Sequence, residues 1–175
     1  TMVGVENLFI DIETNGEQSE AHAWNAIQIN GLEDGWVRYV TMQHFGLSGV
    51  RISGSTRITV EKTKAIHPHS LITGSRRYNF NSYKGAQLIL FKDCFANHSR
   101  HAFVSNGTSF TSGIVTLRGT VDSSYNSSEG HRSWTTGMLF DNFTHLDGLT
   151  PSDGSGRIIA MMNRGDWGTA HGWAS

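Results

Sequence analysis

Short apolar segments separated by Gly, Asn and Ser run along most of the chain. Each is rich in β-branched or aromatic residues and has the length of about five or six residues that is typical of a β-strand. No long segment places an apolar residue at every third or fourth position, as an amphipathic helix does. The pattern therefore predicts an all-β protein. The clearest candidate strands are "NAIQIN" (25–30), "GVRIS" (49–53), "RITVEK" (57–62), "AQLILF" (86–91) and "GIVTLRG" (113–119).

The candidate strands recur in a regular order. A short strand, a turn and a longer strand over 25–45 are followed by a similar unit over 48–66. An Arg followed closely by an aromatic residue recurs at intervals of about 23 to 32 residues, as a solenoid with variable loops produces. These pairs are Arg77 and Tyr78, Arg100 and Phe103, Arg132 and Trp134, and Arg164 and Trp167. We therefore predict a single-domain parallel β-helix of about five or six rungs.

A β-sandwich is the alternative, because its strands are spaced similarly. A sandwich gives no reason for an Arg and aromatic column to recur, so the pattern favours the helix. In the helix, Ile27, Val50, Val104 and Leu139 are expected to point inward. Neither end of the sequence reads as the cap that a solenoid needs. We expect residues 1–175 to be a single module excised from a larger protein.

Charge and composition limit the functional classes. The chain has 14 basic and 15 acidic residues and a net charge of −1, which argues against nucleic acid as a partner. No apolar run is long enough to cross a membrane, and the first residues do not read as a signal peptide. A soluble protein is expected.

The repeated Arg and aromatic residues suit a carbohydrate ligand. Sugar rings stack on Trp or Tyr, and their hydroxyls accept hydrogen bonds from Arg. The expected binding residues are Trp24, Arg77, Tyr78, Arg100, His101, Arg132, Trp134, Arg164 and Trp167. Repetition favours a long ligand held at many points over a single catalytic centre. A purely structural module is a further alternative.

Two enzymatic alternatives stay open. Glycosidic hydrolysis needs two carboxyl groups, for which Glu129 and Asp166 are the best pair. Elimination from a uronate polymer needs a base and a group that neutralises the substrate carboxylate. His101, Glu129, His131 and Arg132, with Arg100, are the candidates for that lyase chemistry.

Metal and cofactor sites are not expected. His98 and His101 have His-x-x-His spacing, but a strand does not bring these side chains to one face. Asp11 and Glu13 alternate on one strand and offer a weak calcium site, with fewer oxygens than calcium requires.

Several segments are similar to a known group of proteins. "HAWNAIQI", "RRYNFN", "RHAFVSNG", "EGHRSWTTGMLFDN" and "NRGDWGTAHGW" resemble the right-handed parallel β-helices of the pectate-lyase-like superfamily. Among these, the chain looks similar to bacterial β-helical carbohydrate-binding modules that recognise xylan. The resemblance implies a secreted, extracellular module that binds a plant cell-wall polysaccharide beside a catalytic domain of the same parent chain. The family's polygalacturonase and pectate-lyase motifs are absent from this sequence, so the resemblance favours binding over catalysis.

Overall fold

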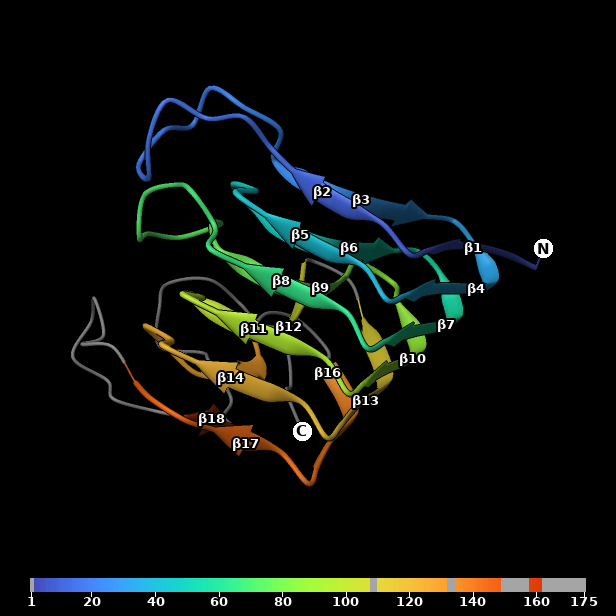
Figure 1. Ribbon diagram of the computed structural model, residues 1–175. Helices are drawn as coiled ribbons and strands as arrows, with labels where there is room; N and C mark the ends of the chain where they lie inside the picture. The colour runs from blue at the N-terminus through green and yellow to red at the C-terminus, as the bar shows by residue number, and fades with distance from the viewer. Residues whose placement is uncertain (1, 108–109, 132–134, 149–157, 162–175) are drawn as a thin grey trace.

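The chain folds into three parallel β-sheets, as a computed structural model shows for residues 2–107, 110–131, 135–148 and 158–161 (Figure 1). Each turn of the chain contributes one strand to each sheet, and like strands of successive turns pair in parallel. Six rungs result among the described residues. The prediction of a single-domain, all-β parallel helix is confirmed, although each turn holds three strands where the sequence pattern suggested two.

The strand bounds follow this threefold repeat. The first sheet contains β1 (Val3–Glu6), β4 (Glu33–Arg38), β7 (Thr56–Glu61), β10 (Gln87–Lys92), β13 (Thr111–Leu117) and β16 (Thr135–Asp141). The second contains β2 (Phe9–Asp11), β5 (Thr41–Gln43), β8 (Lys64–Ile66), β11 (Phe95–Asn97), β14 (Thr120–Asp122) and β17 (Thr144–His145). The third contains β3 (Asn25–Asn30), β6 (Ser48–Ser53), β9 (Tyr78–Tyr83), β12 (His101–Asn106), β15 (Ser128–Gly130) and β18 (Ile159–Ala160).

The corner between the first and second sheets repeats one backbone conformation. A single residue with positive φ lies just after each strand of the first sheet and turns the chain into the second. Left-handed backbone at one residue makes a sharp bend without a long loop. The connections from the second to the third sheet are longer and carry most of the variable loops (Figure 1). The corner residues are Asn7, Tyr39, Lys62, Asp93, Arg118 and Asn142.

The core lies between the three sheets. In the third sheet, Val50 pairs with Ile27 on one side and with Phe80 on the other, and Phe80 pairs with Phe103. The Phe80 and Phe103 rings stack with centroids 4.8 Å apart, and Phe91 of the first sheet meets Phe103 edge-on. Like residues at the same position of successive rungs therefore build the core, as expected for a solenoid.

Two of the four predicted inward positions are wrong. Val104 pairs with Asn81 and Glu129, in the outward-facing column next to the Phe103 column. Leu139 pairs with Val115 and is 52% exposed, because it lies in an outward column of the first sheet. Side chains alternate along a strand, so a shift of one residue reverses their direction.

Within the described ranges, no helical segment has the length and apolarity needed to span a bilayer.

Candidate functional site

The predicted Arg and aromatic column is only partly described. Arg132, Trp134, Arg164 and Trp167 lie outside the described residues. Arg77 and Arg100 do occupy matching positions, since the Arg100 amide donates to the Arg77 carbonyl. Their neighbours Tyr78 and His101 pair across β9 and β12. The recurrence therefore reflects an alignment of successive rungs for Arg77 and Arg100, but their aromatic partners do not align, because Phe103 pairs with Phe80 and not with Tyr78.

Arg77 is buried, contrary to the expectation that it lies on an exposed binding surface. Its Nε and Nη2 donate to the carbonyl oxygen of Ser70 at 2.9 and 2.6 Å, and Nη2 also donates to the Glu17 carbonyl at 3.3 Å. The guanidinium thus holds the two loops before β3 and β9 against the rungs. Burial lowers the pKa of Arg77. A buried guanidinium is tolerated here because backbone carbonyls accept its protons.

Tyr78 and His101 are also buried, at 1% and 0% exposure, and they belong to a polar cluster at the beginning of two neighbouring strands of the third sheet. Glu129 joins the cluster from β15 and His131 from the residue after that strand. Glu129 faces outward because it pairs with Val104 in the outward-facing column. We call Tyr78, Arg100, His101, Glu129 and His131 the buried histidine cluster.

Hydrogen bonds connect the buried histidine cluster. Glu129 Oε1 lies 2.5 Å from His131 Nδ1, and His131 Nε2 lies 3.3 Å from Tyr78 Oη. Arg100 Nη1 donates to the same Tyr78 oxygen at 3.0 Å. Ser127 Oγ donates to Glu129 Oε2 at 2.5 Å. A continuous polar chain therefore runs from a carboxylate, through an imidazole, to a phenol beside a guanidinium.

The environment sets the charges of two groups in the cluster. Burial lowers the pKa of His101 to about 3, and the nearby His131 acts in the same direction. Burial alone would raise the pKa of Glu129, but the hydrogen bonds to His131 and Ser127 help to lower it to about 2. At neutral pH the cluster therefore contains an ionised Glu129 beside a neutral His101.

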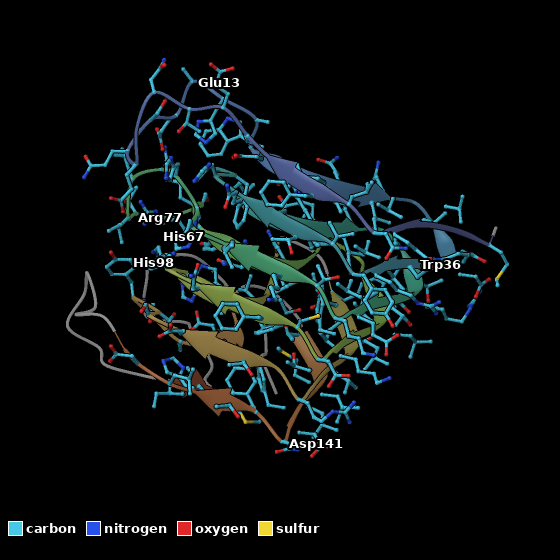
Figure 2. All side chains as sticks on the ribbon, viewed as in Figure 1. Glu13, Trp36, His67, Arg77, His98 and Asp141 are labelled. Atoms are coloured by element: carbon cyan, nitrogen blue, oxygen red, sulfur yellow. The ribbon has the colours of Figure 1, made fainter. Side chains whose placement is uncertain are left out.

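A second candidate site is an open groove where the second sheet ends. His44, His67 and His98 each follow directly after a strand of this sheet, on three successive rungs. All three have positive φ, of 62°, 46° and 48°. Figure 2 shows His67 and His98 on the same side of the molecule as Glu13 and Arg77. The corner conformation thus aligns imidazoles from segments far apart in the sequence.

The groove has two parts that share His44 and His69. One has a volume of about 490 Å³ and the other about 290 Å³. Asp11 Oδ1 lies 2.7 Å from His44 Nδ1, and Thr14 Oγ1 lies 2.7 Å from His69 Nδ1. We call the whole the histidine groove; it is lined by Asp11, Ile12, Glu13, Thr14, Gly16, Glu17, His44, His67, Pro68, His69 and His98.

Two imidazoles of the histidine groove, those of His67 and His69, resist protonation. Partial burial, followed by repulsion from neighbouring histidines, lowers the pKa of both His67 and His69. At neutral pH, His67 and His69 therefore offer neutral imidazoles beside exposed carboxylates. Such groups exchange hydrogen bonds with hydroxyls, since a neutral imidazole both donates and accepts.

Trp24 is the predicted binding residue that is most exposed among those described, at 39%. The Arg76 guanidinium lies 5.5 Å from the centre of its ring, and Arg76 is paired with Glu20. Trp24 follows the loop that carries Thr14 and Glu17 of the histidine groove. An exposed indole is therefore anchored on the loop that forms one wall of the groove.

Sequence reasoning missed the histidine groove because its residues follow three different strands. It also missed that Glu129 and His131, two positions apart at the end of a strand, share one face. His98 does not join His101 and instead lies against the His67 ring, at 5.2 Å. Asp11 and Glu13, for which the sequence predicted a weak calcium site, both line the histidine groove.

A scan against models of known protein families finds no match, and searches of curated proteins and of solved structures find no significantly similar chain.

Proposed function

We propose that this protein is a non-catalytic module that binds a plant cell-wall polysaccharide in an extracellular setting, beside a catalytic domain of its parent chain. The observation that carries the proposal is the histidine groove, which crosses three successive rungs. Parallel strands lie about 4.8 Å apart, so three rungs span about 10 Å. A repeating structure that presents like groups at regular steps suits an extended, repeating ligand.

The chemistry of the groove also suits a sugar. Asp11, Glu13 and Glu17 are exposed carboxylates that accept hydrogen bonds from hydroxyls, and the imidazoles add neutral donors and acceptors. Trp24 on the adjoining loop supplies a ring face for stacking. Xylan is the polymer that the sequence resemblance favours. A net negative lining suits a neutral backbone better than a densely charged uronate.

Affinity electrophoresis in gels containing soluble xylan tests this proposal. We expect the wild-type protein to be retarded, and both His67→Ala and Trp24→Ala to be retarded less. Tyr39→Ala is the matched control, because Tyr39 is an exposed aromatic residue at the corner between the first and second sheets. Circular dichroism checks that each variant is folded. A wild-type protein that migrates freely in xylan and in other cell-wall glucans and mannans refutes the proposal.

A polysaccharide lyase is the second candidate function. The buried histidine cluster favours it, because it unites Arg100, His101, Glu129 and His131, the described residues of the predicted lyase set. In that chemistry, Tyr78 would pass a proton to His131, and Arg100 would stabilise the phenolate. Tyr78 is only 1% exposed, so a polymer does not reach it in this conformation.

Absorbance by unsaturated uronates distinguishes the two functions. Release of unsaturated products from a uronate polymer, abolished by Tyr78→Phe, would identify a lyase. Retardation in xylan with a flat absorbance trace across several uronate polymers supports the binding module.

A further inference from the structure

Three potential metal ligands meet inside the buried histidine cluster. His101, Glu129 and His131 each offer one ligand atom, and these atoms lie within 4.8 Å of one another. All three side chains are buried, at 0%, 2% and 7% exposure. Among the described residues, this is the group of at least three His, Cys, Asp or Glu side chains that is close enough to hold one ion.

One nitrogen of the His101 ring has no hydrogen-bond partner among the described residues. Its Nδ1 lies 2.7 Å from the Ser127 carbonyl, which only accepts hydrogen bonds, so Nδ1 carries the proton. Nε2 then presents a lone pair that is buried and has no hydrogen-bond partner. The same ring packs against His131, at 4.5 Å between centroids, and against Tyr78, at 5.3 Å. A buried acceptor without a donor is unfavourable, and a bound cation would satisfy it.

The orientation of His101 is also the one that metal-binding histidines adopt. A backbone carbonyl that accepts from one ring nitrogen fixes the tautomer and leaves the other nitrogen for the metal. Ser127 has a second role, because its hydroxyl donates to Glu129 Oε2. One residue therefore orients both His101 and Glu129.

From these contacts we propose that His101, Glu129 and His131 bind a divalent transition-metal ion, and that Zn²⁺ fits best. Two imidazoles and one carboxylate are a common zinc ligand set, with bonds of about 2.0 to 2.2 Å. Ligand atoms around a tetrahedral ion are then about 3.3 Å apart. Glu129 Oε1 lies 2.5 Å from His131 Nδ1 and 3.8 Å from His101 Nδ1, so side-chain movements must bring His101 Nε2 to an ion held by the other two residues. The ion would take the place of the proton between Glu129 and His131.

Zinc titration of the chelator-treated protein by calorimetry tests the site. We expect saturable binding of one ion per chain. Glu129→Gln and His101→Gln should each weaken binding at least tenfold. Arg100→Gln should strengthen it several-fold, since that change removes a positive charge from the cluster while a hydrogen-bond donor remains.

His69→Gln is the matched control, because the histidine groove also presents imidazoles to solvent. The variant should leave the stoichiometric binding unchanged. Loss of zinc binding in His69→Gln with normal binding in Glu129→Gln would place the ion in the groove and overturn the proposal. Should Glu129→Gln fail to fold, X-ray absorption of the wild-type zinc complex decides: two imidazoles in the coordination shell support the site, and fewer contradict it. A wild-type chain without saturable zinc binding also overturns it.

Discussion

Arg77 provides the clearest test of whether a residue in the sequence repeat supports the fold or binds a ligand. In Arg77→Met the aliphatic stem keeps most of its packing, but the Ser70 carbonyl loses both of its guanidinium donors. Hydrogen bonds to a charged group contribute about 1.5 to 3 kcal/mol each, and the two here share one acceptor. Removing a buried cation recovers part of its desolvation cost. We expect the free energy of unfolding to fall by about 2 kcal/mol.

Urea unfolding followed by tryptophan fluorescence measures this change, and limited proteolysis at residues 67–77 reports whether the loop before β9 is released. Arg57→Met is the matched control, because Arg57 is an exposed residue paired with Asp34 and Glu33, and its loss should change stability little. Xylan retardation of folded Arg77→Met should equal that of the wild type. Unchanged stability together with lost retardation would show that Arg77 contacts the ligand, and would refute its assignment to the fold.

Two further predictions concern acid and packing. Folding lowers the pKa of His101 from 6.5 to about 3 and that of Glu129 from 4.5 to about 2. At pH values between the lowered and the ordinary pKa of each group, the unfolded chain therefore binds more protons than the folded chain. Stability should therefore fall as pH falls, by about 4 kcal/mol between pH 7 and pH 4, and equal urea midpoints at the two pH values would contradict this. Gly49→Ala should cost about 1 to 3 kcal/mol in thermal unfolding, because its Cβ would lie 2.6 Å from that of Ala65. Gly74→Ala has open space around it and should unfold like the wild type.

The fold was predictable because its periodicity is local and repeated. The alignment of Arg77 with Arg100 appears in the sequence as a simple interval, since each turn must return the chain to the same column. The number of sheets was harder to predict. The corners at residues such as Tyr39 and Lys62 use a single left-handed residue, without the Gly or Pro that usually marks a turn.

The sequence did not show which of the predicted polar binding residues are buried. Arg77, Tyr78 and His101 read as exposed binding residues because their polar groups normally stay in water. Their partners in the structure are the Ser70 and Ser127 carbonyls, His131 and Arg100, which come from other rungs or from loops of variable length. A sequence interval reports which residues align, but it does not report what covers them.

The two candidate sites differ in how their side chains are arranged. In the histidine groove, like residues repeat on successive rungs and remain open, which suits a ligand that itself repeats. In the buried histidine cluster, each position carries a different group: a phenol on β9, an imidazole on β12 and a carboxylate on β15. Unlike groups that converge on one enclosed point suit a small ligand such as a metal ion. The two arrangements therefore predict two independent ligands, and Glu129→Gln should weaken zinc binding at least tenfold while xylan retardation persists.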